Sequence, residues 1–454
     1  MTFDPRTVEA FRFVDYRFDA GGEGGSPRVR LRYALEPGPE FVETLEFPGA
    51  RTRLTDLEAE ALDRSLQHLF VACGVSYYKA AVPPRFDLGP LALTPQAAGF
   101  FTTLYREGLG EMAHRNGLDL SGLRFPADPK ARPRPVRLPL PRRTAVAIGG
   151  GKDSVVALER VLRCGEPSMM VSVGAPPAVQ RVVEVARRLH PELDHVIVRR
   201  RISPKLLELN REGALNGHIP ISAVFAFTLA TAGLLHGFDT AAVGNERSAN
   251  VGSKVGGRLV NHQYSKSFAC ERAMAELMRS EQNPGFLYVS VLRPLSELAI
   301  ARAFAALPAY HRAFLSCNRA FRLTEPGKGW CGDCPKCRFV FLALAPFLEK
   351  PALLDIFGGR NLLAEPGQAE GYRELAGLRG SKPFECVGEV LESAAALELL
   401  LALPEWKEEA VLRLLGDELR GFASRQRREM EAWCRPSREH AVPERLLESV
   451  LAAE

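Results

Sequence analysis

Residues 143–164 read RTAVAIGGGKDSVVALERVLRC and divide into a predicted strand, a glycine-rich turn and a predicted helix. Residues 144–148 are an apolar run rich in residues that favour strands. Gly149, Gly150 and Gly151 then allow a tight turn whose backbone can lie close to a ligand. After the turn, apolar residues recur at helical spacing and charged residues share the outer face. The stretch therefore predicts a strand–turn–helix unit around which the rest of the chain is arranged.

The start of this predicted helix suits phosphate, because its first N–H groups have no partner within the helix and point outward. Lys152 adds a cation, Ser154 a hydroxyl and Asp153 a carboxylate that can hold Mg²⁺ against phosphate oxygens. The spacing excludes a Walker P-loop, in which lysine is followed directly by serine or threonine. We predict that residues 149–154 bind ATP and Mg²⁺ and that Asp153 is also catalytic. A turn without a ligand is the alternative.

GGGKDS at 149–154 resembles the SGGxDS loop of enzymes that split ATP between its α and β phosphates and adenylate a substrate. Gly149 stands where that family has its first serine, so one hydroxyl contact to phosphate is missing. The resemblance implies an α/β fold with a doubly wound parallel sheet of the PP-loop ATP-pyrophosphatase type.

Length and composition set limits on the rest of the chain. At 454 residues it exceeds what one hydrophobic core usually serves, so we expect about two to four domains. A net charge of +5 is too small to indicate nucleic-acid binding. We find neither a signal sequence nor an apolar run of transmembrane length, which predicts a cytoplasmic protein without a membrane partner. Nine cysteines without a signal sequence favour reduced thiols, some of them bound to metal.

Residues 1–125 are predicted to form an N-terminal α+β domain. Alternating residues on both sides of GGEGGSP predict a hairpin, EFVETLEFPG a third strand, and residues 54–74 and 95–116 two helices. Between these helices, Tyr77, Tyr78 and Lys79 are expected in a loop that contacts substrate. An aromatic pair packed at a domain seam is the alternative. Residues 126–142 contain six prolines and are interpreted as a linker.

Residues 143–340 are predicted to form the ATP-binding domain. Apolar runs at 168–173, 195–198, 240–243 and 286–292 alternate with helical segments, as in a parallel sheet. Ligands of such sheets lie beyond the carboxyl ends of the strands, where GNERSANVGS and NHQYSKSF are rich in functional groups. A solvated loop is the alternative interpretation. The candidate residues in these two loops are Glu246, Arg247, Asn250, His262, Tyr264 and Lys266.

Two further residues follow predicted strands. Gly174 comes after the run at 168–173, where the resembling family holds adenine against backbone. Arg293 follows the run at 286–292, and its guanidinium is suited to two oxygens of a pyrophosphate leaving group. Both are therefore predicted to contact ATP.

Four cysteines form the second strong motif. Cys331, Cys334 and Cys337 are separated by two residues each, and Cys317 lies upstream. This spacing predicts a closed four-thiolate structural zinc site. An iron–sulfur cluster is the main alternative, because C-x2-C-x2-C also occurs in such proteins. A glycine-rich loop followed by CGxCxxC resembles the 7-cyano-7-deazaguanine synthases.

Residues 341–454 have a helical pattern and no further motif for chemistry. The basic stretch at 425–438 is interpreted as a solvated helix face and not as a nucleic-acid site.

Six segments together resemble the UDP-N-acetyl-α-D-muramoyl-L-alanyl-L-glutamate epimerases: GVSYYKA, GLGEMAHRNGLDL, AVAIGGGKDS, GNERSANVG, NHQYSKSF and WCGDCPKC. The resemblance covers most of the chain. It implies ATP-dependent conversion of the terminal L-glutamate of the muramoyl dipeptide nucleotide to D-glutamate, in peptidoglycan precursor synthesis. The reaction would pass through a carboxyl adenylate, release AMP and pyrophosphate, and need no pyridoxal cofactor. Tyr77, Tyr78, Lys79, Arg247, Asn250 and Tyr264 would then contact the substrate.

An epimerase must also move a proton on and off the α-carbon. His262 titrates nearest neutrality, and burial beside other cations can lower the pKa of Lys266, so these two are the predicted bases. Glu246 is a reserve for catalysis or Mg²⁺ binding, and Cys270 a minor candidate. The open alternatives are a ligase or nucleobase- or RNA-modifying enzyme of the 7-cyano-7-deazaguanine synthase or thiolation type, and an inactive nucleotide-binding module.

Overall fold

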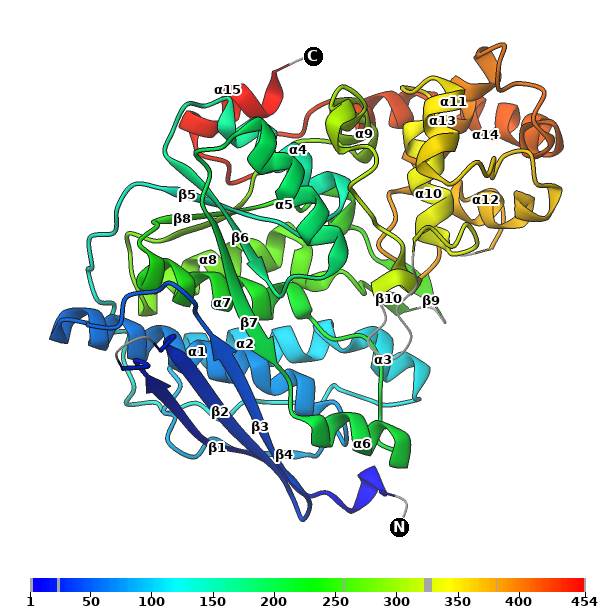
Figure 1. Cartoon of the computed structure of the whole chain (residues 1–454). Helices are drawn as coiled ribbons and strands as arrows, with labels where there is room; N and C mark the ends of the chain where they lie inside the picture. Colours follow the sequence, from blue (N-terminus) through cyan, green and yellow to red (C-terminus); the bar gives the residue numbers. More distant parts are fainter. Residues whose placement is uncertain (1–2, 23–24, 256–257, 322–328, 381, 453–454) are drawn as a thin grey trace.

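The computed structural model describes residues 3–22, 25–255, 258–321, 329–380 and 382–452 (Figure 1). Within them the chain is a mixed α/β protein, and nine strands join in one sheet. These strands are β1 (Ala10–Asp19), β2 (Arg28–Glu36), β3 (Glu40–Glu46), β4 (Arg85–Asp87), β5 (Thr144–Ala147), β6 (Ser168–Val173), β7 (His195–Arg201), β8 (Thr240–Val243) and β11 (Leu287–Ser290). Their spatial order is β11-β8-β5-β6-β7-β3-β2-β1-β4. A separate two-stranded ribbon contains β9 (Ser253–Val255) and β10 (Arg258–Val260).

The half of the sheet from β11 to β7 is parallel throughout, as the apolar runs and their spacing predict. Helices cover both of its faces, which keeps these strands out of water. Side chains of α4 and α5 pack on one face, and those of α7 and α8 on the other. The helices of this part are α4 (Lys152–Leu162), α5 (Pro177–Leu189), α6 (Pro204–Glu212), α7 (Ile221–His236), α8 (Phe268–Glu281) and α9 (Glu297–Ala305).

The N-terminal half of the sheet is a meander in which β1, β2 and β3 are antiparallel, and β3 pairs with β7. The chain therefore carries its N-terminal strands and its parallel strands in one continuous sheet. The predicted hairpin and third strand are confirmed. The short edge strand β4 runs parallel to β1. The four-segment domain division stays a prediction.

The helix that covers the antiparallel half is longer than expected. Helix α1 (Asp56–Tyr78) begins with a capping box between Thr55 and Glu58, and it includes Tyr77 and Tyr78. The prediction of a loop at these tyrosines is therefore wrong. Aromatic packing extends the helix, because Tyr77 stacks on Tyr33 with ring centroids 5.0 Å apart, and Tyr78 stacks on Phe86 at 4.8 Å. The GVSYYKA segment thus ends a core helix.

The predicted helix at 95–116 is divided into α2 (Pro95–Gly108) and α3 (Gly110–Arg115). Gly108 packs against Pro220, and a Cβ at that position would lie 2.5 Å from the proline ring. Residues 126–142 contain no helix or strand, as their prolines predict.

The C-terminal part is helical and gathers at one end of the molecule in Figure 1, apart from α15, which returns to pack on α4. Its helices are α10 (Pro335–Leu344), α11 (Lys350–Ile356), α12 (Ala369–Leu375), α13 (Val390–Ala402), α14 (Ala410–Cys434) and α15 (Glu444–Leu451). The described part of the chain also contains six short 3-10 turns: η1 (Pro5–Thr7), η2 (Arg247–Asn250), η3 (Tyr264–Lys266), η4 (Pro308–Tyr310), η5 (Asn318–Phe321) and η6 (Pro366–Gln368). In the described ranges, no helix has the length and apolar character that a bilayer span requires.

Candidate active site

The glycine-rich loop turns from the carboxyl end of β5 into α4, as predicted. Gly150 has φ +82°, and a Cβ there would lie 2.9 Å from the backbone of Ala178, so only glycine fits. A Cβ on Gly149 would meet no described heavy atom within 4 Å. Gly151 caps α4 without a side-chain hydrogen bond among the described residues. The loop therefore presents bare backbone at a helix N-terminus, a favourable place for an anion.

The residues after the loop form a buried charge cluster. Lys152 is almost fully buried, and its Nζ contacts the carboxylates of Asp153 and Glu297. Burial would lower the pKa of Lys152, but the two carboxylates raise it. Burial would likewise raise the pKa of Asp153, yet Lys152, Lys336 and Lys266 together hold it below the ordinary value. Lys152 thus balances carboxylates inside the protein, which differs from the expected direct contact with phosphate.

A cavity of about 370 Å³ lies beside this cluster, at the carboxyl ends of the parallel strands. The cations at its wall are Lys266 and Lys336. The cation beside the phosphate was expected to be Lys152. Asp153 contributes a carboxylate and Ser154 a hydroxyl that donates to the Gly151 carbonyl at 2.9 Å. The wall comprises Ala147, Gly149, Gly151, Asp153, Ser154, Ser222, Phe225, Leu229, Val243, Gly244, Asn245, Lys266, Tyr288, Leu315, Ser316, Asn318, Lys336 and Cys386.

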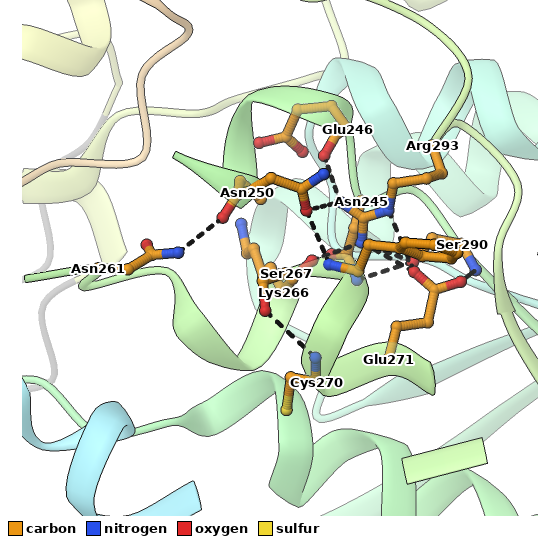
Figure 2. Close-up of polar contacts among 12 residues, drawn as sticks. Asn245, Glu246, Asn250, Asn261, Lys266, Ser267, Cys270, Glu271, Ser290 and Arg293 are labelled. Carbon is orange, nitrogen blue, oxygen red and sulfur yellow. Dashed lines mark hydrogen bonds and ion pairs between the residues drawn. The ribbon is translucent and has the colours of Figure 1, made fainter. Parts of the chain in front are cut away.

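Arg293 is fully buried and holds the two polar loops together, as Figure 2 shows. Its guanidinium donates to Glu271 Oε2 at 2.8 Å and to the backbone carbonyls of Glu246 and Lys266. Glu271 in turn accepts from the Ser290 N–H at 2.8 Å, at the end of β11. The prediction that Arg293 faces a pyrophosphate is contradicted by this geometry, because protein groups already take up its donors. Arg293 positions the loops.

Asn250 and Asn261 fix the shapes of these loops (Figure 2). Asn250 Oδ1 accepts from the Phe268 N–H at 2.7 Å, and Asn261 Nδ2 donates to the Ala249 carbonyl at 3.0 Å. The Asn250 side chain is therefore engaged with backbone, which gives it a structural task beside the predicted contact with substrate. Glu246 is buried, and its Oε1 accepts from Ser248 Oγ at 3.4 Å. Its carboxylate also raises the pKa values of Lys266 and Glu297.

Arg247, expected to contact substrate, meets the C-terminal segment. Its guanidinium lies over the Trp433 ring at 4.3 Å and donates to the Arg435 carbonyl at 3.0 Å. Burial lowers its pKa from the ordinary value. The interaction docks the end of α14 onto η2 and occupies one face of the Arg247 side chain.

His262 and Lys266, the predicted bases, have pKa values that differ from those expected. Burial first, and then His218, Lys266 and Lys382, lower the pKa of His262 to about 3. The imidazole is therefore neutral at neutral pH, and its Nε2 has no hydrogen-bond partner among the described residues. The neighbouring Cys386 is the largest influence on Lys266 and raises its pKa, although burial opposes this rise. Lys266 thus stays a cation, and the prediction that its pKa is lowered is wrong.

The remaining candidates, Tyr264 and Cys270, belong to one hydrophobic core and do not line the first cavity. Tyr264 is half-buried against the core that includes α7, and burial raises its pKa. Cys270 is fully buried in α8, and burial raises the pKa of its thiol as well. A thiol in that setting has little access to a substrate, so the minor candidate Cys270 is disfavoured.

A second cavity of about 530 Å³ contains Gly174 and Lys79 and shares Phe225 with the first. Gly174 follows β6 as predicted and has φ +77°. Burial lowers the pKa of Lys79 to about 8, and its Nζ contacts Asn216 Oδ1. Lys79 therefore faces a cavity as a substrate contact requires, whereas Tyr77 donates to buried Glu43 at 2.8 Å and Tyr78 to the Pro83 carbonyl at 3.2 Å.

The four motif cysteines converge at the N-terminal end of α10, which contains Cys337. Ligand atoms of Cys317, Cys331, Cys334 and Cys337 all lie within 4.8 Å of one another. Cys331 Sγ and Cys337 Sγ are 3.7 Å apart. Four thiolates at ~2.3 Å around one tetrahedral ion are ~3.8 Å from each other, so the geometry fits a single metal ion. The knuckle also places Lys336, which lies between two of the cysteines, at the cavity wall.

Several groups at the cavity or in the charge cluster beside it were not predicted from the sequence. Glu297 opens α9 and Lys336 lies inside the CPKC knuckle, so their positions next to known motifs were a usable signal. Ser316 and Asn318 flank Cys317 in the same way. Cys386 lies in KPFECVGE, which matches no motif, and only the fold brings it to the cavity.

These features define a class: a mixed α/β protein with a glycine-rich loop and a charged cavity at the carboxyl ends of parallel strands, beside a four-cysteine cluster. Two family models match the chain, the MurL N-terminal domain over residues 2–291 and the MurL C-terminal domain over residues 313–430. The chain belongs to the MurL family.

Three curated relatives support this assignment, and each is named UDP-N-acetyl-alpha-D-muramoyl-L-alanyl-L-glutamate epimerase. The protein of Xanthomonas oryzae pv. oryzae (strain MAFF 311018) is 42% identical over 99% of this chain and 98% of its own length. The Salinispora tropica protein is 41% identical over 91% of this chain and 89% of its own. The Micromonospora sp. protein is 41% identical over 91% of each. The names favour an epimerase over the ligase and nucleobase-modifying alternatives.

Proposed function

We propose that this chain is an isomerase that converts the terminal L-glutamate of UDP-N-acetyl-α-D-muramoyl-L-alanyl-L-glutamate to D-glutamate in peptidoglycan precursor synthesis. The observation that carries the proposal is 42% identity over 99% of the chain to a relative with that name. Identity at this level spans both the sheet and the C-terminal helices, so the whole architecture is shared. We place the reaction in the cytoplasm, where nucleotide-linked precursors are made.

We further propose that the reaction consumes ATP at the glycine-rich loop. The support is a fit between residues and ligand: bare backbone at Gly149–Gly151, an open space where a Gly149 side chain would lie, and the cations Lys266 and Lys336 at the wall. Asp153 would hold Mg²⁺, which would neutralise phosphate charge. The second cavity, with Gly174, has room for the nucleoside, since ligand pockets usually measure about 300–1,000 Å³.

Adenylation would make the α-proton of glutamate removable. An ionised carboxylate resists loss of the neighbouring proton because negative charge would accumulate on the same group. A carboxyl adenylate offers an electron-poor carbonyl that accepts this charge, and Lys266 and Lys336 would stabilise it in the cavity. Return of a proton to the opposite face inverts the centre, and hydrolysis of the adenylate then gives the D-glutamate product and AMP.

The four-cysteine cluster is proposed to hold one structural Zn²⁺. The support is the sulfur spacing, since an iron–sulfur cluster places several atoms between its thiolates and holds them farther apart. A bound ion would fix the knuckle that carries Lys336. We expect about one zinc per chain, the stoichiometry of a closed four-thiolate site. Elemental analysis that finds iron and labile sulfide would contradict this.

The reaction is tested by incubating the purified chain with the L-alanyl-L-glutamate nucleotide, ATP and Mg²⁺. We expect D-glutamate after acid hydrolysis of the product, together with equal amounts of AMP and pyrophosphate. Absence of D-glutamate would overturn the epimerase proposal. Epimerisation that proceeds equally well without ATP would overturn only the adenylation step.

A further inference from the structure

The candidate bases drawn from the sequence leave the proton-transfer group unassigned, and one side chain at the cavity is suited to that role. Cys386 is half-buried at the wall that also contains Asp153 and the glycine-rich loop. Lys266 Nζ lies 3.8 Å from Cys386 Sγ. The thiolate is the nucleophilic and basic form of cysteine, and an ammonium group at this distance is a suitable partner for its charge. Among the described residues that line the first cavity, Cys386 is the only cysteine.

The segment that carries Cys386 is held firmly against the rest of the site. Gly388, two residues on, has no room for a side chain, because a Cβ would lie 2.4 Å from the Phe339 ring. The Glu389 N–H donates to Glu392 Oε2 at 2.9 Å, and Glu392 Oε1 accepts from the Glu297 N–H at 2.6 Å. The buried Glu392 carboxylate thus joins the Cys386 segment to the start of α9. Glu297, the partner of Lys152, lies at that helix start.

His262, one of whose buried ring nitrogens has no hydrogen-bond partner among the described residues, lies next to this segment. The His262 ring is 6.1 Å from the Phe384 ring, two residues before Cys386, and 5.8 Å from the His218 ring. His262 is 7% exposed, and its Nε2 has no hydrogen-bond partner among the described residues. A buried polar atom left without a partner usually has a ligand or water to meet. The 382–387 segment and the 261–266 loop therefore form one wall built from both halves of the chain.

We propose that Cys386, as a thiolate paired with the Lys266 ammonium, is a catalytic residue that removes the α-proton of the glutamyl residue in the epimerisation. The inference rests on the proposed function, whose reaction requires such a group. Lys266 is a positioning residue that holds the thiolate charge. The C-terminal part of the chain would then contribute directly to catalysis, because it places the Cys386 side chain beside the glycine-rich loop.

The proton-transfer step balances as follows. The thiolate takes the α-proton, so the S–H bond forms as the Cα–H bond breaks, and the electron pair moves into the activated carboxyl group as an enolate. Water in the cavity delivers a proton to the opposite face of Cα, and the hydroxide that remains is neutralised by a proton from solvent. The Cys386 thiol then returns its proton to solvent, and the active thiolate is restored.

The test compares two activities in Cys386→Ala and Cys386→Ser. One is deuterium incorporation at the glutamate α-carbon in heavy water with ATP and Mg²⁺, and the other is substrate-dependent pyrophosphate release. We expect deuterium incorporation to fall by about 10²–10⁴-fold, the usual contribution of a general base. Pyrophosphate release should persist, since adenylation does not need the thiol. Cys164→Ser, at a half-buried thiol outside the cavity, is the matched control and should keep both activities.

A second measurement tests the pairing with Lys266. Iodoacetamide should alkylate Cys386 at neutral pH about tenfold faster in the wild type than in Lys266→Met, because the thiolate is the reacting form. Peptide mapping separates Cys386 from the other thiols.

The proposal is overturned if either Cys386 variant incorporates deuterium at the wild-type rate. It is also overturned if the folded variants lose both activities equally, which would place the thiol in binding or adenylation. The pairing with Lys266 is overturned if Lys266→Met leaves the rate of Cys386 alkylation unchanged. If the wild type incorporates deuterium without releasing pyrophosphate, the ATP proposal fails, whereas the comparison of deuterium rates still decides the role of Cys386.

Discussion

The antiparallel and parallel halves of the sheet bury polar groups in different ways. In the antiparallel half, each buried tyrosine hydroxyl has a fixed acceptor: Tyr33 donates to the Phe70 carbonyl at 2.8 Å and Tyr105 to the Val71 carbonyl at 2.6 Å. At the carboxyl ends of the parallel strands, buried charges face one another around a cavity. There Glu297 Oε1 and His262 Nε2 have no hydrogen-bond partner among the described residues.

Within one continuous sheet, the antiparallel half therefore contributes mainly to stability and the parallel half carries the candidate active site. Aromatic packing with hydrogen-bonded tyrosine hydroxyls holds a helix against three antiparallel strands. The charge cluster around Asp153 is held in place by Arg293 and Glu392 and keeps groups that a substrate can meet. Substitutions in the two halves should therefore affect different measurements.

The largest effect is expected at the parallel end. Asp153→Asn keeps the size of the side chain but removes the carboxylate charge and the proposed Mg²⁺ ligand. We expect substrate-dependent pyrophosphate release to fall by roughly 10²–10³-fold, as when one preorganised electrostatic contact is lost. The thermal unfolding midpoint should change little, because Lys152 keeps Glu297 as a partner. Asp63→Asn on α1 is the control and should leave activity intact. Full turnover in folded Asp153→Asn would remove this carboxylate from the reaction.

The opposite pattern is expected in the aromatic core. Phe13 is fully buried against Phe11, Tyr33 and Phe70, so Phe13→Ala should lower the free energy of unfolding by about 3–5 kcal/mol. Urea unfolding measures this change. The folded fraction should retain its activity per molecule. Leu57→Ala, at an exposed position on α1, should stay within about 0.5 kcal/mol of the wild type. Loss of activity in fully folded Phe13→Ala would break the comparison.

A smaller, pH-dependent effect should come from the histidines beside the cavity. Burial lowers the pKa of His262 to about 3 and that of His218 to about 4, below the ordinary value of 6.5. Because the folded pKa is the lower one, their stability contribution is complete above pH 6.5 and is lost as the pH falls toward 3–4. Each histidine adds at most about 1.4 kcal/mol per pH unit to the slope.

Urea unfolding between pH 7 and pH 4 tests this expectation. In His262→Gln the unfolding free energy should depend less steeply on pH. The slope should fall by up to the contribution of one bound proton. His114→Gln, at an exposed position, is the control. An unchanged slope in His262→Gln would show that this histidine is not held neutral by the fold.

The sequence by itself determined those features that depend on local spacing. The parallel strands, the glycine-rich turn and the four-cysteine knuckle are short patterns whose periods and glycines fix the backbone directly. The prolines at 126–142 likewise excluded regular structure, because proline removes a donor and fixes φ. The resemblance to the epimerase family added the substrate, which no local pattern could supply.

Only the tertiary structure decided which groups face the cavity. Tyr77 and Tyr78 entered the core because aromatic neighbours from distant strands extend α1 over them. Arg293 pairs with Glu271 and Lys152 pairs with Glu297, so neither cation makes the phosphate contact predicted for it. Both carboxylates are distant from their partners along the chain. Cys386 reached Lys266 across 120 residues. Charge partners and burial arise from such long-range contacts, and they set the pKa values that local sequence patterns leave undetermined.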